Sequence, residues 1–131
     1  MNIGIVGVTG SVGKEMLNCI ESLDIKYKIL KLFSSNKSKG KQIIFMDKEY
    51  IIEDVNNNSF YNLDVVLFAI DSKYSKIYFE YAKAHNCLVI DNSSAFRMDK
   101  NYPLIIPEIN SELINTTHDL IANPNCSTIL M

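Results

Sequence analysis

The residue best suited to act as a nucleophile is Cys126, which follows Asn-Pro-Asn and precedes Ser-Thr. The pattern predicts that a helix starts here, and a helix N-terminus lowers the pKa of a thiol and favours the nucleophilic thiolate. The other two cysteines, Cys19 in a predicted helix and Cys87 at the opening of a predicted strand, are interpreted as inert small hydrophobic side chains. The residues alone leave open whether Cys126 is catalytic.

Arg97 is the one arginine among the 13 cationic side chains of the chain. It ends the segment Asn92-Ser-Ser-Ala-Phe-Arg97, which follows a predicted strand. In an open α/β sheet, ligands bind beyond the carboxyl ends of the strands. A guanidinium can hold a phosphate or a carboxylate there with two parallel hydrogen bonds. The alternative is a salt bridge from Arg97 to Asp99 or Glu108.

A glycine-rich segment, Gly7-Val-Thr-Gly-Ser-Val-Gly13, lies between a predicted strand and a predicted helix. Glycines at such a turn let the backbone approach a diphosphate, and the helix N-terminus supplies free N–H groups. The spacing is Gly-x-x-Gly-x-x-Gly, and the strand-turn-helix context is what makes it informative. The segment therefore predicts dinucleotide binding, with a tight turn that binds no ligand as the alternative.

The choice between NAD and NADP can be argued from the end of the second predicted strand. NAD-specific sites commonly carry an acidic residue there for the ribose 2′-hydroxyl, yet residues 31–46 contain none. They contain instead four lysines and three serines, namely Lys31, Lys37, Lys39, Lys41, Ser34, Ser35 and Ser38. This composition favours a 2′-phosphate and hence NADP, and a solvated basic loop is the alternative.

The two histidines, His85 and His118, are not singled out as bases. A cysteine nucleophile usually needs one, but His85 ends a predicted helix and His118 lies in a polar turn. No metal site is expected.

The elements that must position these residues alternate along the chain. Strands are predicted at 2–6, 28–33, 64–70 and 87–90, helices at 11–23 and 72–85, and a pair of short strands at 42–45 and 50–52 that turn at Asp47-Lys48. The first helix should bury Val12, Met16, Leu17, Ile20 and Leu23, which share one face. This order predicts an α/β fold, Rossmann-like and doubly wound, with a mainly parallel sheet and flanking helices.

Composition narrows the class of protein. The 131 residues are 47% hydrophobic and 21% charged, which suits one folded domain rather than a disordered chain. The net charge of −2 argues against binding to nucleic acid by bulk electrostatics. No apolar run reaches about 18 residues, and no signal peptide is recognisable. Three cysteines without a disulfide-like pattern suit the cytoplasm.

Four blocks of the sequence together resemble the N-terminal part of the aspartate-semialdehyde dehydrogenase family. They are the Gly7–Gly13 loop, Phe33-Ser-Ser-Asn-Lys-Ser-Lys-Gly-Lys41, Ile90-Asp-Asn-Ser-Ser-Ala-Phe-Arg-Met-Asp99 and Asn123-Pro-Asn-Cys-Ser-Thr128, and Pro107-Glu-Ile-Asn110 also fits. The resemblance runs from residue 2 to the end. N-acetyl-glutamyl-phosphate reductases would show Asn-Pro-Gly-Cys-Tyr at residues 123–127, which favours the aspartate enzyme.

The resemblance implies reduction of 4-aspartyl phosphate by NADPH to aspartate 4-semialdehyde and phosphate, a step in lysine, threonine and methionine biosynthesis. It implies that Cys126 displaces phosphate to form a thioester, which hydride then reduces, while Asn125 polarises the carbonyl and Arg97 binds the phosphate. It further implies cofactor contacts from Gly7, Thr9, Gly10, Ser11, Val12 and Gly13, and 2′-phosphate contacts from Ser35, Lys37 and Ser38.

The sequence departs from the family pattern in two places and in length. Lys37 stands where the family usually has an arginine, and Asp71-Ser72 replaces a common Gly-Gly pair, so an anionic side chain would crowd or repel a diphosphate. Family members are more than twice as long. Residues 1–131 are therefore expected to form the NADP-binding domain, ending at the start of the cysteine helix, with the catalytic and dimerisation domain beyond it and inactivity on its own.

Two alternatives to an enzyme fragment stay open. One is a non-catalytic nucleotide-binding module or decayed relative, motivated by Asp71-Ser72 and the missing half. The other is a structural protein with a Rossmann-like core. The expected partners are a small-molecule substrate and, for the complete protein, a second copy in a homodimer or higher oligomer, with no nucleic acid or membrane.

Overall fold

The computed structural model describes residues 1–110, 112 and 119–124, and it confirms the predicted parallel α/β architecture. Five parallel strands form one sheet in the order β2-β1-β5-β6-β7. Their bounds are β1 (Asn2–Val6), β2 (Ile29–Phe33), β5 (Val65–Phe68), β6 (Leu88–Asp91) and β7 (Leu120–Ala122). These strands are rich in Val, Ile, Leu and Phe because a parallel sheet is covered on both faces.

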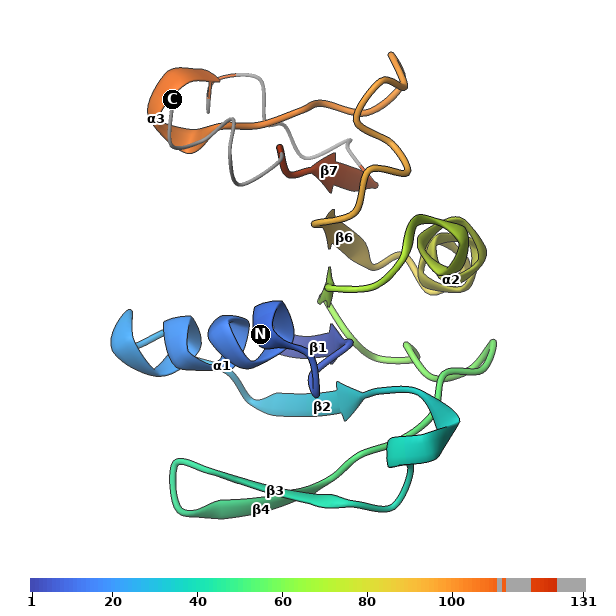
Figure 1. Cartoon of the computed structure of the whole chain (residues 1–131). Coiled ribbons are helices and arrows are strands. Elements are labelled where there is room, and N and C mark those ends of the chain that lie inside the picture. Colours follow the sequence, from blue (N-terminus) through green and yellow to red (C-terminus); the bar gives the residue numbers. More distant parts are fainter. Residues whose placement is uncertain (111, 113–118, 125–131) are drawn as a thin grey trace.

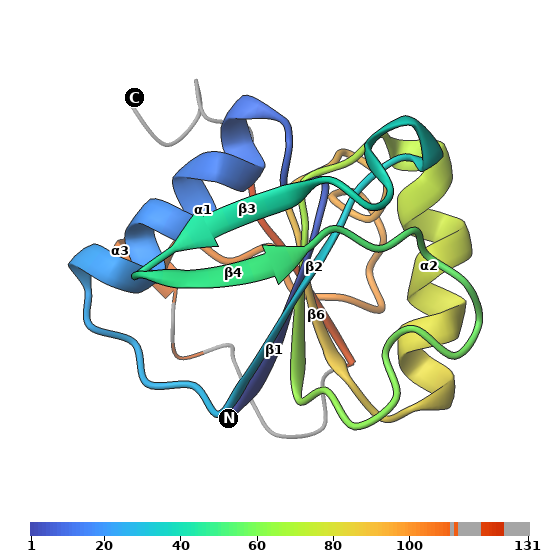
Figure 2. The ribbon, with the colours of Figure 1, turned by 90° about the horizontal axis from the view of Figure 1, so that it is seen from below.

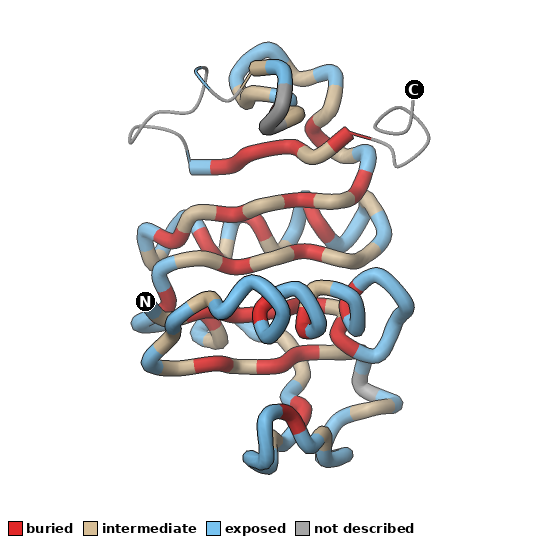
Figure 3. The backbone as a smooth tube through the Cα atoms, turned by 90° about the vertical axis from the view of Figure 1, so that its left-hand side faces the viewer, coloured by how far each residue is buried: buried red, intermediate tan, exposed pale blue. Residues whose placement is uncertain are grey.

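Helices cover both faces of the sheet (Figure 1). The helix α1 (Ser11–Ser22) lies on one side and α2 (Ser72–Ala84) on the other, and the short α3 (Pro107–Asn110) follows the loop after β6. Two apolar clusters result, one built around Phe79 and Ala82 of α2 and the other around Leu17 and Ile20 of α1. Figure 3 shows the buried residues concentrated along the strands and on the sheet-facing side of the helices.

The predicted apolar face of α1 is only partly buried. Leu17 and Ile20 are buried and Met16 is half-buried, but Val12 is 43% exposed and Leu23 is 69% exposed. The prediction was wrong at these two ends for a geometric reason. Val12 lies in the first turn of the helix, which starts beyond the carboxyl end of β1. Leu23 lies beyond the last helical residue.

The hairpin of β3 (Gln42–Phe45) and β4 (Lys48–Ile51) lies beside β2 (Figure 2). Its turn residues are Met46 and Asp47, not the predicted Asp47-Lys48, and both have positive φ. Two-residue hairpin turns need this geometry to match the twist of their strands. The strand β4 therefore starts at Lys48 and ends at Ile51, whereas the sequence predicted a strand over residues 50–52.

The topology creates a switch point between β1 and β5. The chain passes from β1 through α1 to β2 on one side of β1, whereas β5 pairs on the other side and leads away through α2 to β6. Adjacent strands whose connections diverge leave a crevice at their carboxyl ends, where α/β proteins bind ligands. Among the described residues, none of the helices is long and apolar enough to cross a membrane.

Candidate functional site

A pocket of about 410 Å³ lies at the switch point, where β1, β2 and β5 end. Its wall comes from the carboxyl ends of three strands, the turns that follow them and the helix α2. The lining residues are Val6 of β1, Gly7, Thr9 and Gly10 in the turn after β1, Ser34 and Ser35 after β2, Ala69, Ile70 and Asp71 after β5, and Tyr74 and Tyr78 of α2. A pocket of this size falls in the range of small-molecule sites and can hold part of a dinucleotide.

The first turn needs glycine at two positions. Gly7 has a φ of +91°, and a Cβ there would overlap the carbonyl oxygen of Ala69 in the neighbouring turn. At Gly13, a Cβ would overlap the carbonyl oxygen of Gly7, so the helix packs directly on the turn. The amides of Gly7 and Val8 both donate to the carbonyl oxygen of Phe33, at 2.9 and 3.1 Å. The turn after β1 is therefore hydrogen-bonded to the end of β2 and packed closely against the turn after β5.

Gly10 is the N-cap of α1 and faces the pocket as bare backbone. Its φ and ψ are −78° and 167°, and no side chain caps the helix. Gly10 and the following Ser11 and Val12 are exposed. The first N–H groups of a helix have no carbonyl partner within it and carry the positive end of its dipole. The turn thus offers the donors and close backbone approach that suit a diphosphate.

Serines from the second turn complete this side of the pocket. The hydroxyls of Thr9 and Ser34 are hydrogen-bonded at 2.7 Å, which joins the β1 and β2 turns. Ser35 lines the pocket and its carbonyl accepts from the amide of Ser38, at 2.9 Å, in the 3₁₀ turn η1 (Asn36–Ser38). Lys37 lies in the same 3₁₀ turn and is exposed.

The four lysines predicted to form a cradle are not gathered together. Lys31 lines a separate recess between β2 and β4. The ammonium of Lys39 is 3.4 Å from the carboxylate of Asp54, a residue that follows β4. Lys37 and Lys41 are exposed on the loop. Lys37, Lys39 and Lys41 therefore share one loop, and Lys31 lies apart from them.

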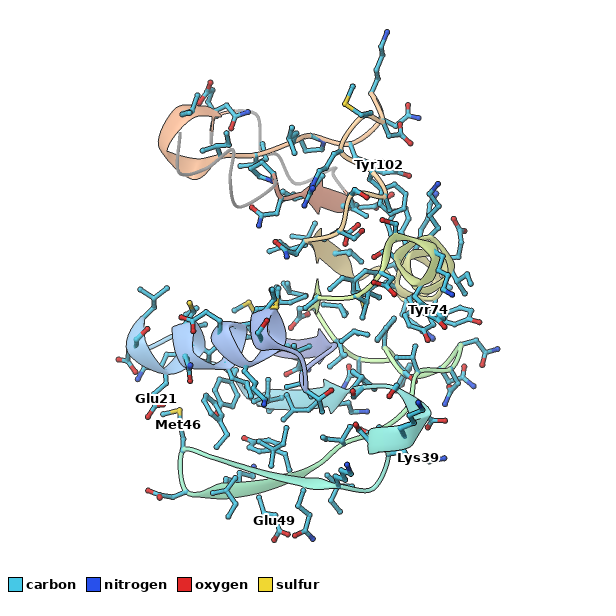
Figure 4. The ribbon with its side chains drawn as sticks, viewed as in Figure 1. Glu21, Lys39, Met46, Glu49, Tyr74 and Tyr102 are labelled. Atoms are coloured by element: carbon cyan, nitrogen blue, oxygen red, sulfur yellow. The ribbon has the colours of Figure 1, made fainter. Side chains whose placement is uncertain are left out.

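The sequence placed Asp71 beside a bound diphosphate, but the two tyrosines that α2 adds to the pocket wall were not predicted. Tyr74 and Tyr78 lie one helical turn apart on α2, and their rings stack with centroids 5.9 Å apart. Tyr74 is 41% exposed, and Figure 4 shows it projecting from α2. Burial, followed by the neighbouring Tyr74, Tyr81 and Asp54, raises the pKa of Tyr78. The i, i+4 spacing of the tyrosines was available in the sequence, but their proximity to the glycine turn was not.

Asp71 and Ser72 differ in where they are directed. Asp71 is the N-cap of α2, makes no capping hydrogen bond with its side chain, and lies exposed in the pocket wall. The hydroxyl of Ser72 is hydrogen-bonded to that of Ser94, at 2.7 Å. Of the pair, Asp71 lines the pocket and Ser72 does not.

Arg97 donates hydrogen bonds to two backbone carbonyls. Its Nε donates to the carbonyl of Asn123 and its Nη2 to the carbonyl of Asn92, both at 2.8 Å. Among the described side chains, Arg97 forms no salt bridge to Asp99, and the side chain of Glu108, the other predicted partner, lies outside the described part of the structure. The contacts with the two carbonyls use two of the five N–H groups of a guanidinium. Arg97 therefore joins the turns that follow β6 and β7.

A buried aspartate, Asp91, organises the same loop, and its role was not predicted from the sequence. Its carboxylate accepts from the amide and the hydroxyl of Ser93, at 2.9 and 2.8 Å, and from the hydroxyl of Ser75, at 3.1 Å. These three donors satisfy the carboxylate in a fully buried position. The signal in the sequence was an acidic residue ending an apolar strand.

The predicted nucleophile, Cys126, lies outside the described residues, as do Asn125 and His118. Cys87 is buried with its thiol 3.3 and 3.0 Å from the carbonyls of Phe60 and Leu63, and burial raises its pKa to about 11. Cys19 is exposed on α1, so it is not a packed hydrophobic side chain. His85 ends α2, with its Nε2 3.0 Å from the carbonyl of Asn57.

Comparison with known proteins finds one family model over most of the chain. Residues 2–117 match the family described as "Semialdehyde dehydrogenase, NAD binding domain". The aspartate-semialdehyde dehydrogenases of Bacillus subtilis and Aquifex aeolicus are 37% and 41% identical to this chain and cover 100% and 98% of it. The chain spans 38% and 39% of these relatives.

A solved structure has the same fold. Aspartate semialdehyde dehydrogenase II of Vibrio cholerae, complexed with ASA, superposes with a TM-score of 0.90 and 37% identity. The match covers 98% of this chain and 42% of that one.

Proposed function

The chain belongs to the semialdehyde dehydrogenase family, through its NAD-binding domain, and on this premise we propose that it is the cofactor-binding part of an aspartate-semialdehyde dehydrogenase. The observation that carries the proposal is the pocket at the switch point, with the exposed backbone of Gly10 in its wall. In this role the complete enzyme reduces 4-aspartyl phosphate to aspartate 4-semialdehyde and phosphate.

The dinucleotide would be held from two sides. On one side, the turn of Thr9, Gly10, Ser11 and Val12 presents amides to the diphosphate. Gly7 and Gly13 let the turn pack closely. Support comes from the absence of any side chain at the N-cap of α1 and from the exposure of Val12, which sequence periodicity alone would bury. On the other side, Tyr74 and Tyr78 offer aromatic surface on which the adenine base can pack.

We further propose NADP as the preferred cofactor. Ser35, Lys37 and Ser38 would bind the 2′-phosphate, as the family pattern implies. The hydrogen bond between Ser38 and Ser35 and the exposure of Lys37 leave hydroxyls and a cation at the end of β2. Lysine pairs with phosphate as a point charge, without the two-pronged geometry of arginine.

The chemistry would take place at Cys126. Its thiolate attacks the acyl carbon of 4-aspartyl phosphate, the bond from that carbon to the phosphate oxygen breaks, and phosphate leaves. Bound NADPH supplies the hydride that reduces the resulting thioester. The hemithioacetal then collapses, releasing the aldehyde and the Cys126 thiolate. Asn125 would polarise the carbonyl, and Arg97 would direct its remaining N–H groups to the phosphate.

A thermal unfolding scan with NADP, with NAD and without ligand tests the cofactor proposal. A ligand that binds only the folded state adds about 2.7 kcal/mol of stability at a concentration 100 times its Kd. A larger rise of the midpoint with NADP than with NAD is expected. A cooperative transition that neither nucleotide shifts would instead support a non-catalytic module.

Competitive alkylation tests the proposed nucleophile. We expect Cys126 to react fastest near pH 7, exposed Cys19 more slowly, and Cys87 slowest of the three. Because the pKa of Cys87 is raised to about 11, its thiol stays protonated in the folded protein up to that pH. Peptide mass spectrometry after a short pulse of iodoacetamide gives the order. Equal labelling of Cys126 and Cys19 would count against an activated thiolate.

A further inference from the structure

The acidic residue that residues 31–46 lack is supplied from a distant part of the sequence. After β4 the chain turns back along β2, and its residue Glu53 forms a parallel bridge with Phe33. The amide of Glu53 donates to the carbonyl of Leu32, and the amide of Ser34 donates to the carbonyl of Glu53, both at 3.0 Å. The segment therefore extends the sheet at the carboxyl end of β2, and Asp54 is the next residue.

The segment that follows β4 is also hydrogen-bonded to the basic loop of residues 37–41. The amide of Gly40 donates to the carbonyl of Ile52, and the amide of Ile52 donates to the carbonyl of Lys41, both at 2.8 Å. Lys39 is thus held close to Asp54, and its Nζ lies 3.4 Å from Oδ1 of that carboxylate. Figure 4 shows Lys39 beside η1, at the end of β2.

Asp54 lies next to the pocket wall, because the carbonyl of the preceding Glu53 accepts a hydrogen bond from the amide of Ser34, which lines the pocket. The charge of Asp54 is one of the influences that raise the pKa of Tyr78, which lines the pocket. The carboxylate is 40% exposed and the lysine side chain 57% exposed, so the pair is a surface ion pair whose own contribution to stability is small. Its effect on a charged ligand is different, because a neutralised lysine no longer adds a positive charge.

We propose that Asp54 is a cofactor-selecting residue that neutralises Lys39 and thereby reduces the preference of this chain for the 2′-phosphate of NADP over the 2′-hydroxyl of NAD. The inference rests on the proposed dinucleotide-binding function. It gives Asp54 a position comparable to that of the acidic residue that NAD-binding sites place at the end of the second strand. The net charge at this end of the sheet then comes from Lys37, because Lys39 and Asp54 neutralise each other.

Binding of 2′,5′-ADP and 5′-AMP measures the selection, since these probes differ only in the 2′-phosphate. Calorimetry gives the affinity for 2′,5′-ADP divided by the affinity for 5′-AMP. This ratio is compared between the wild-type chain, Asp54→Asn, Lys39→Gln and the double variant. We expect Asp54→Asn to raise the ratio about threefold to tenfold at low salt, and 0.5 M NaCl to remove most of the gain. Lys39→Gln should lower it, and the double variant should return near the wild-type value.

The pair of Asp24 and Lys26, 2.8 Å apart in the turn between α1 and β2, provides the matched control. Asp24→Asn changes the net charge equally and should leave the ratio unchanged. An equal rise in Asp24→Asn and Asp54→Asn would overturn the proposal in favour of a net-charge effect. A fall in the ratio for Asp54→Asn would overturn it too, since Asp54 would then be holding Lys39 toward the phosphate.

The two proposals fail in different ways. If the wild-type chain binds neither probe, both the dinucleotide-binding function and the selection by Asp54 are wrong. If it binds both and Asp54→Asn leaves their ratio unchanged, only the selection is wrong. Asp54 and Lys39 are joined through exposed side chains, and circular dichroism of each variant verifies the fold. Should one single variant fail to fold, the opposite shift expected from the other still tests the proposal.

Discussion

The turns after β1 and β5 leave neighbouring strands at the same edge of the sheet, and each leads directly into a helix. Their N-cap residues, Gly10 and Asp71, have similar extended backbones, with φ and ψ of −78° and 167° and of −65° and 149°. Neither helix has a side-chain cap. The first turn presents bare backbone to the pocket, whereas the second presents the carboxylate of Asp71 and the ring of Tyr74.

This difference shows that a shared backbone path does not decide what a turn binds. Both helix N-termini carry unpaired N–H groups and a favourable dipole. At the first, the N-cap glycine has no side chain that could separate those groups from an anion. At the second, a negative side chain occupies the N-cap itself. One side of the pocket is thus suited to phosphate, and the other to a base or a hydroxyl.

The largest effect should come from Gly7→Ala, which disturbs the contact between the two turns. The added Cβ would overlap the carbonyl of Ala69, and alanine is strained at a φ of +91°. We expect a loss of about 3–5 kcal/mol in the free energy of unfolding. Gly40→Ala is the control, since φ is +84° there but nothing lies within 4 Å. It should cost about 1 kcal/mol, and equal losses in urea unfolding would contradict the clash.

Gly10→Asp gives the first turn the charge of the second. Aspartate is a good N-cap, so stability should stay the same or rise by a few tenths of a kcal/mol. NADP affinity should fall by about tenfold or more, because the carboxylate would meet the diphosphate. Calorimetry compares this variant with Gly10→Asn, which has nearly the same size and no charge. Equal losses in the two variants would point to bulk rather than charge.

Asp71→Asn makes the opposite exchange. Asparagine also caps helices well, so the fold should be kept. Removal of the charge should tighten NADP binding by about threefold to tenfold, and added salt should narrow the gain because it screens exposed charges. Asp24→Asn, at the other end of the sheet, controls for net charge. Weaker binding would show instead that the carboxylate of Asp71 accepts a hydrogen bond from a ribose hydroxyl.

Ser72→Ala tests the neighbour of Asp71, whose hydroxyl is hydrogen-bonded within the protein and which does not line the pocket. Loss of the hydrogen bond to Ser94 should lower stability by about 0.5–1 kcal/mol, with no change in NADP affinity. Ser94→Ala should give a similar loss, and the double variant little more, because both remove one interaction. Thermal midpoints of the four proteins give the comparison. Additive losses would mean that the two hydroxyls act independently.

The elements of this fold could be predicted because their signals are local. Strands such as Val65–Phe68 are continuous apolar runs, and the helix α2 follows from its periodicity. The glycine turn was recognisable because Gly7, Gly10 and Gly13 lie between a strand and a helix. The predictions were wrong where the local signal ends, in the burial of Val12 and in the position of the hairpin turn at Met46-Asp47.

Sequence by itself thus determined the parallel α/β class, the position of the glycine turn and the family. The tertiary structure alone decided which side chains meet. It paired Lys39 with Asp54, which lies 15 residues away in the sequence, and it placed Tyr74 and Asp71 in the same pocket as Gly10. It also turned Arg97 onto two backbone carbonyls. Periodicity and turn chemistry act over a few residues, whereas charge and contact depend on distance in space, which the topology of the sheet sets.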